Sequence, residues 1–167
     1  MYCIFSKKGQ ASMPDLLFSV LFFLLLLAGF FYYSDSLQDA STSLADRRVL
    51  DATASNLAEF IIKNPGAPSN WEHMGNLNSV EQIGLAQKDR VLSPEKVVAF
   101  VNYGNLEYEQ TKIALSLPYY DFYVEFSGGI SLSTGLAPGV NKNASVVQRL
   151  VTINGVETQV TLTLYES

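Results

Sequence analysis

The feature that most constrains this chain of 167 residues is a long apolar segment from Leu16 to Tyr33. This apolar segment consists mostly of leucine and phenylalanine and contains no charged residue. A helix of about 18 residues would be about 27 Å long, close to the ~30 Å hydrocarbon thickness of a bilayer. Each leucine, phenylalanine or valine contributes about −0.3 to −0.6 kcal/mol to membrane insertion. The sequence therefore predicts a membrane-spanning helix over about residues 14–33.

Charged residues on either side of the apolar segment give it a direction. Lys7 and Lys8 precede it, whereas Asp35 and Asp39 follow it. Basic residues favour the cytoplasmic side of a membrane. We therefore expect a single-pass membrane protein with its N-terminus inside the cell and its C-terminal bulk outside.

Three interpretations of this N-terminal region compete. A secretory signal peptide would need a small-residue cleavage site directly after its apolar core, and Ser34-Asp35-Ser36 matches such a site poorly. A plain single-span anchor needs no cleavage. In a pilin-type signal, a peptidase on the cytoplasmic side cuts before the apolar segment, and the helix stays in the mature protein.

The residues before the apolar segment favour the third interpretation. The sequence Lys7-Lys8-Gly9-Gln10-Ala11-Ser12, followed by an acidic residue and a leucine-rich run, resembles the class III signal peptides of archaeal type IV pilin-like proteins. This resemblance implies that prepilin peptidase cuts after Gly9 and leaves Gln10 as the new N-terminus. It also implies partners: the membrane, the pilus assembly machinery, and copies of itself or related pilins in a helical surface filament.

An acidic residue near the start of the apolar segment is a candidate assembly residue. Many members of the family carry an acidic residue at the fifth mature position, which Pro14 occupies here, and Asp15 follows it. Asp15 can act as a helix-start carboxylate that the helix macrodipole stabilises. It can also pair with the freed amine of a neighbouring Gln10 when helices bundle. The two roles are compatible.

The region after the apolar segment predicts a continuation of the same helix. Residues 34–63 contain neither proline nor glycine, and Asn64-Pro65-Gly66 then ends the helix. Its upper part carries an apolar stripe that we expect to be buried: Val49, Leu50, Ala54, Leu57, Phe60 and Ile61. The polar residues Arg48, Asp51, Ser55 and Glu59 are expected to face away from this stripe.

The C-terminal part predicts a small α+β head. Helices are expected from Ser93-Pro94-Glu95 to about residue 101 and over residues 106–117, with a turn at 102–105 and buried Leu106, Ile113 and Leu117. Residues 64–93 read as loop, with Trp71 in the core. Strands are expected over about residues 122–126, 130–134, 146–153 and 156–165, the last two joined by an Asn-Gly hairpin turn. These strands predict an antiparallel sheet of about four strands.

Combined with the resemblance, these elements divide the chain into three parts. They are a signal propeptide at residues 1–9, a long N-terminal helix at 10–63, and an extracellular α+β head at 64–167. A long hydrophobic helix that carries such a head is the type IV pilin-like architecture that the resemblance implies.

Composition excludes several functional classes. The chain has one cysteine, Cys3, and one histidine, His73, so no disulfide forms within it and no metal or catalytic site is expected. The net charge of −5 argues against nucleic acid as a partner. No cofactor motif is present. Asn143-Ala144-Ser145 is a sequon for N-glycosylation in a predicted outward-facing loop.

These observations lead to one expected function and two alternatives. We expect a non-enzymatic structural subunit, a major or minor pilin, that waits in the membrane and then joins a filament that could serve adhesion. One alternative is an uncleaved single-span membrane protein whose extracytoplasmic head binds a ligand or partner. The other is a membrane-anchored enzyme, which the lack of a catalytic constellation disfavours.

Overall fold

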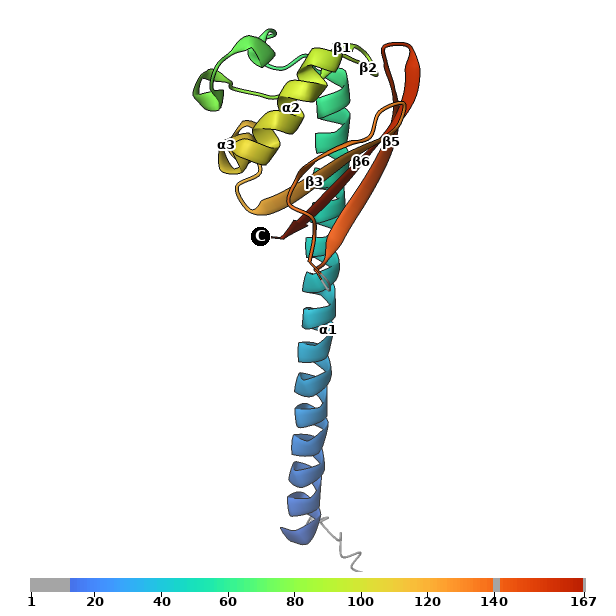
Figure 1. Ribbon diagram of the computed structural model, residues 1–167. Coiled ribbons are helices and arrows are strands. Elements are labelled where there is room, and N and C mark those ends of the chain that lie inside the picture. The colour runs from blue at the N-terminus through green and yellow to red at the C-terminus, as the bar shows by residue number, and fades with distance from the viewer. Residues whose placement is uncertain (1–12, 140–141, 167) are drawn as a thin grey trace, which may run out of the picture. The chain divides into compact units, whose positions relative to one another are not determined.

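The computed structural model describes the backbone of residues 13–139 and 142–166, and the side chains in this range except those of 13–15 and 35–43. The chain forms two compact units, residues 1–45 and residues 46–167 (the second unit). Figure 1 shows the order of the elements along the chain. The fold class is α+β, as predicted, with an apolar helix at its N-terminal end.

Helix α1 (Met13–Lys63) is continuous, as the absence of proline and glycine from residues 34–63 predicted. It contains a stretch, Leu16–Ser34, with a mean hydropathy of 2.4 and no buried residue, which is long and apolar enough to cross a membrane. The helix ends at the predicted place, where the Asn64 amide donates to the Phe60 carbonyl at 3.0 Å. Part of α1, from Asp46 onwards, belongs to the second unit.

The second unit contains a six-stranded sheet in the order β1-β2-β5-β6-β3-β4. The strands are β1 (Ala86–Lys88), β2 (Val91–Leu92), β3 (Tyr120–Gly128), β4 (Leu132–Gly135), β5 (Ala144–Ile153) and β6 (Val156–Glu166). Strand β2 pairs with β5 in parallel, and the other pairs are antiparallel. The prediction of a four-stranded antiparallel sheet is therefore wrong. It missed β1 and β2, which are three and two residues long and too short to show a periodic pattern.

The predicted hairpin between β5 and β6 is confirmed. Ile153 pairs with Val156, and the two turn residues have the positive φ angles that an Asn-Gly turn supplies, 51° at Asn154 and 79° at Gly155. This hairpin aligns the two longest strands of the sheet, and β3 then pairs with β6 along nine residues.

The helices that follow α1 differ from the prediction. Helix α2 (Pro94–Leu106) runs through the turn expected at residues 102–105, and α3 (Tyr108–Ala114) is shorter than expected. Glu107, with φ −127° and ψ 54°, breaks the helix between them and resets the helical phase. Leu106 and Ile113, which were expected to be buried on one face of a single helix, belong to different helices and are 83% and 76% exposed.

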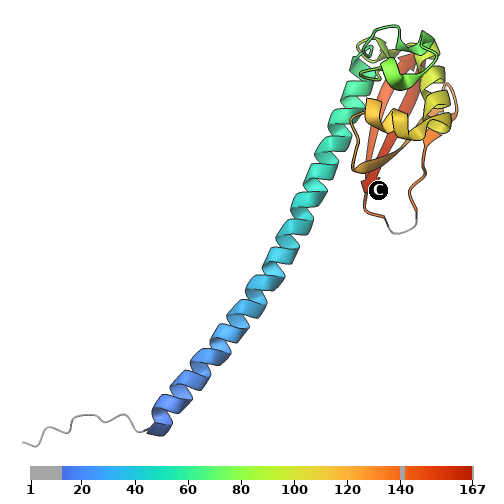
Figure 2. The same cartoon turned by 90° about the vertical axis from the view of Figure 1, so that its left-hand side faces the viewer.

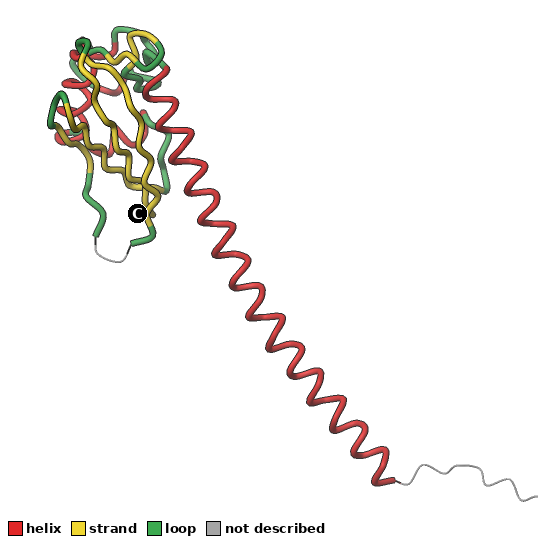
Figure 3. Tube along the Cα trace, turned by 90° about the vertical axis from the view of Figure 1, so that its right-hand side faces the viewer, coloured by secondary structure: helices red, strands yellow, loops and turns green. Residues whose placement is uncertain are grey.

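One face of the sheet packs against the helices of the second unit. Residues that alternate along β3 and β6, such as Phe122 and Leu164, are fully buried on this face. Figures 2 and 3 view the sheet from its two sides. Helices α2 and α3 lie in front of the sheet in Figure 2, and the strands lie in front in Figure 3. Among the described side chains of α1, the buried ones are Leu50, Ala54, Leu57, Ala58, Ile61 and Ile62; of the predicted stripe, Phe60 is half-buried and Val49 is exposed.

The loop between α1 and α2 carries two short 3₁₀ helices, η1 (Trp71–His73) and η2 (Leu77–Ser79). Trp71 is fully buried, as predicted, and its indole Nε1 donates to the Gly84 carbonyl at 2.8 Å. This bond satisfies the one polar atom of a large buried ring. Trp71 thereby fixes η1 on the core.

Candidate functional site

The largest exposed apolar surface among the described residues lies on α1. Its members are 48–73% exposed: Leu16, Leu17, Phe18, Val20, Leu21, Phe22, Phe23, Leu24, Leu25, Leu26, Phe30 and Phe31. Consecutive helical residues point about 100° apart, so these side chains surround the helix on all sides. Folded soluble proteins rarely expose so large a patch. This stretch of α1 is long and apolar enough to cross a membrane.

The predicted signal residues Lys7, Lys8, Gly9 and Gln10 lie outside the described residues. The backbone of Asp15 lies in the first turn of α1, and its side chain is outside the described part of the chain. The cleavage site and the proposed Gln10–Asp15 pairing therefore stay predictions.

The predicted glycosylation site lies at the start of β5. Asn143 is exposed and directly precedes Ala144, the first residue of the strand. Ser145, the third residue of the sequon, points to the buried side of β5 and is only 6% exposed. The Asn143 side chain is therefore exposed to solvent, whereas the third residue of the sequon is buried.

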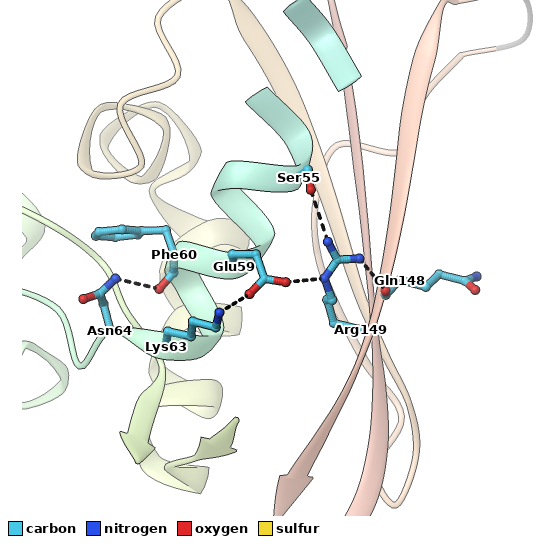
Figure 4. A network of polar contacts seen from close by, with 7 residues as sticks. All are labelled: Ser55, Glu59, Phe60, Lys63, Asn64, Gln148 and Arg149. Atoms are coloured by element: carbon cyan, nitrogen blue, oxygen red, sulfur yellow. Dashed lines mark hydrogen bonds and ion pairs between the residues drawn. The ribbon is translucent and has the colours of Figure 1, made fainter. Parts of the chain in front are cut away.

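A polar cluster within the second unit joins α1 to β5 (Figure 4). Arg149 Nε donates to Glu59 Oε1 at 2.7 Å, and Arg149 Nη2 donates to Ser55 Oγ at 3.1 Å. The second oxygen of Glu59 pairs with Lys63 Nζ at 2.7 Å. The expectation that Ser55 and Glu59 simply face away from the packed side of α1 is therefore wrong. Both residues lie at the edge of α1 that meets β5, and the Glu59 side chain is 31% exposed.

The two cations that flank Glu59 lower its pKa from 4.5 to about 2, first through the hydrogen bond from Lys63 and then through that from Arg149. A carboxyl group whose pKa is lower in the folded state contributes stability above its unfolded pKa, and this contribution is lost as the pH falls through the folded value. The pairing of Glu59 with Lys63 and Arg149 therefore makes its full contribution to the stability of the second unit above about pH 4.5. This contribution is lost below about pH 2.

We expect Glu59→Gln to lower the urea midpoint of the second unit at pH 7, because the variant keeps the side-chain shape but loses both ion pairs. The difference from the parent protein should shrink between pH 4.5 and pH 2, since the parent carboxylate itself becomes protonated there. Tryptophan fluorescence of Trp71 in detergent-solubilised protein follows the transition. Glu109→Gln, at an exposed residue of α3, is the control, and a pH-independent difference for Glu59→Gln would contradict the assignment.

A second polar cluster joins α3 to β3. Asp121 Oδ1 accepts from Lys112 Nζ at 2.8 Å and from the Tyr108 hydroxyl at 2.9 Å, and that hydroxyl accepts from the Phe122 amide at 3.1 Å. Burial alone would raise the pKa of Asp121, but the bonds from Lys112 and Tyr108 outweigh it and lower this pKa. Burial raises the pKa of Tyr108, and its bond to Asp121 adds to the rise. The carboxylate is thus held ionised between two donors, as expected of a structural link.

The fold also assembles a group that sequence reasoning missed. Glu72, His73 and Glu95 come together at an open pocket between η1 and α2, whereas no metal or catalytic site was expected at His73. Adjacent Glu72 and His73 were a weak signal in the sequence. Glu95 lies 22 positions further on, and only the tertiary fold brings it near.

Comparisons with protein-family models, with curated proteins and with solved structures found no match to this chain.

Proposed function

We propose that this protein is a structural subunit, a major or minor pilin, of an archaeal type IV pilus-like surface filament. In this proposal prepilin peptidase removes residues 1–9, and the mature chain assembles through its apolar helix. The observation that carries the proposal is the unburied apolar stretch Leu16–Ser34, which belongs to the same helix whose later residues enter the core of a folded unit.

A helix of this kind can occupy two environments. Before assembly, lipid surrounds the apolar side chains; in a filament, the helices of neighbouring subunits replace the lipid. Helix association out of a bilayer gains little from hydrophobicity itself and depends on packing and polar contacts. A helix that is apolar on all sides suits both environments, because neither transfer exposes it to water.

The second unit supports the proposal through its organisation. Its core includes α1 residues from Leu50 to Ile62, so the folded unit cannot separate from the helix without losing part of its own core. A subunit in a fibre under tension needs such a connection. The exposed Asn143 would lie outside the cell under this proposal, where an N-linked glycan would be carried on the filament surface.

The N-terminal residue of the protein tests the proposal. We expect protein recovered from membranes and from surface fibres to begin at Gln10, with its amine free or cyclised to pyroglutamate, when its terminal peptide is identified by mass spectrometry. Subunits found in fibres that begin at Gln10 would support both processing and assembly. A chain that begins at Met1 in membranes and is absent from fibres would contradict the proposal and favour an uncleaved anchor with an extracytoplasmic binding head.

A further inference from the structure

An open pocket of about 480 Å³ in the second unit brings together three side chains with metal-binding atoms. Glu72 and His73 come from η1, and Glu95 comes from the first turn of α2. One ligand atom from each lies within 4.8 Å of the others, and His73 Nε2 is 4.0 Å from Glu95 Oε2. Pro94, Val98 and Ala99 line the apolar remainder of the pocket.

The Glu72 carboxylate indicates that this group is incomplete. Its side chain is only 10% exposed, and its Oε2 atom is buried without a hydrogen-bond partner. Lys96 Nζ forms an ion pair with this atom at 3.9 Å, a distance that is too long for a hydrogen bond. A buried carboxylate oxygen that accepts no hydrogen bond is costly, so a further positive group close to this oxygen would be stabilising.

Lys96 is occupied by other partners. Its side chain is 7% exposed, and its ammonium donates to the Pro65 carbonyl at 2.6 Å and to the Ser69 carbonyl at 2.7 Å. These bonds hold the loop that precedes η1. Two carboxylates beside one ammonium leave the cluster with a net negative charge, which a divalent cation would reverse.

The frame around the three side chains is firmly held. Trp71 anchors η1 through its buried ring, and the Met74 carbonyl after η1 accepts from the Tyr103 hydroxyl of α2. At the other side, the Ser93 amide donates to the Leu85 carbonyl at 2.9 Å and fixes the start of α2. A metal site gains affinity when its ligands are placed by a rigid scaffold.

We propose that Glu72, His73 and Glu95 bind a divalent transition-metal ion of the Zn²⁺ class at this pocket. One imidazole nitrogen with two carboxylate oxygens is a donor set that suits Zn²⁺ and its neighbours, whereas Ca²⁺ and Mg²⁺ prefer oxygen alone. Zinc bonds to these atoms are about 2.0–2.2 Å long, so the ligands must approach one another by about 1 Å. His73 and Glu95 can do so, because their side chains are 66% and 74% exposed.

The bound ion would link η1 to α2 and present its remaining coordination positions to the pocket. Three protein ligands leave at least one position of a tetrahedral ion for water or for an oxygen or nitrogen donor of a partner. The inference goes beyond the proposed function, since it concerns the second unit alone and holds whether or not residues 1–9 are removed.

The test is Zn²⁺ binding to the full chain in detergent, made without a polyhistidine tag and with Cys3→Ser, so that His73 is the only histidine and no thiol is present. We expect titration calorimetry to show saturable binding of one Zn²⁺ per chain and Zn²⁺ to raise the thermal midpoint. His73→Ala and Glu95→Gln should each weaken binding at least about tenfold, since even loss of a residue that only supports a ligand costs 10–100-fold.

Matched controls make the result decisive. Glu109→Gln removes an exposed carboxylate on α3 and should bind Zn²⁺ like the parent, and circular dichroism verifies that each variant is folded. Excess Ca²⁺ should not displace the bound Zn²⁺. The proposal is overturned if the parent shows no saturable binding, if a folded His73→Ala binds as tightly as the parent, or if Ca²⁺ displaces Zn²⁺ at similar concentration.

Discussion

Replacing Gly9 with valine should leave the protein uncleaved in the membrane and abolish its surface filaments. The class III signal resemblance places the cut after Gly9, and a branched side chain there would block access of the peptidase to the peptide bond. The uncleaved chain keeps Lys7 and Lys8 next to the helix that would have to enter the filament core. Burying unpaired charges costs several kcal/mol each, so assembly should fail even if the machinery engages the subunit.

Two measurements separate processing from membrane insertion. Intact mass of detergent-extracted protein should show residues 1–9 retained in Gly9→Val, while the amount in the membrane fraction is unchanged because the apolar segment is intact. Gly75→Val is the matched control: a side chain at Gly75 would meet no atom within 4 Å, so this variant should be cleaved and assembled like the parent. Normal cleavage and normal fibres from Gly9→Val would refute the pilin proposal.

Several helices and strands could be predicted from strong local signals in the sequence. The second half of helix α1 follows from residues 34–63, which lack proline and glycine and end at Asn64-Pro65-Gly66, and the β5–β6 hairpin follows from Asn154-Gly155. Strand β3 follows from alternating apolar residues, of which Phe122 and Phe126 are fully buried. In each case, residues adjacent in the sequence determine the conformation, so no knowledge of the tertiary fold is needed.

The missed features depend on contacts between distant parts of the chain. Strand β2 exists because two residues pair with the end of β5, and nothing in its own sequence requires a strand. Gly104, interpreted as a turn residue, lies within α2 because it packs closely against Thr134 of β4. A glycine that permits close approach and a glycine that ends a helix cannot be distinguished locally.

The candidate sites likewise divide into one that neighbouring residues reveal and others that depend on contacts between distant residues. The apolar segment was evident from the sequence because its signal is composition over successive residues. The link between Glu59 and Arg149 joins residues 90 positions apart, and the approach of Glu95 to His73 depends on the loop fold that Trp71 and Lys96 hold. A charged helix residue such as Glu59 is interpreted as solvated when the element that packs against it is not known, which explains the wrong expectation for Glu59.

Removing the charge of Asp15 should prevent filament assembly without lowering membrane insertion. If the freed amine of Gln10 pairs with Asp15 of a neighbouring subunit in an apolar surrounding, Asp15→Asn leaves that amine charged and unpaired. Breaking one partner of a buried pair costs about 3–5 kcal/mol, and a filament repeats this loss at every subunit. Insertion should persist, because the variant removes a charge next to the apolar segment and adds none. Electron microscopy of surface fibres and the membrane content of processed protein measure the two effects separately.

Charge and position can be distinguished by two further variants. Asp15→Glu keeps the carboxylate and should retain filaments, whereas Asp46→Asn makes the same charge change at an exposed residue of α1 and should leave assembly unchanged. If Asp15→Asn forms filaments at the parent level, the carboxylate serves only to stabilise the start of the helix, a contribution of about 0.3–1 kcal/mol that assembly can tolerate. Loss of filaments in Asp15→Asn alone would instead show that growth of the fibre depends on one charge at the head of each apolar helix.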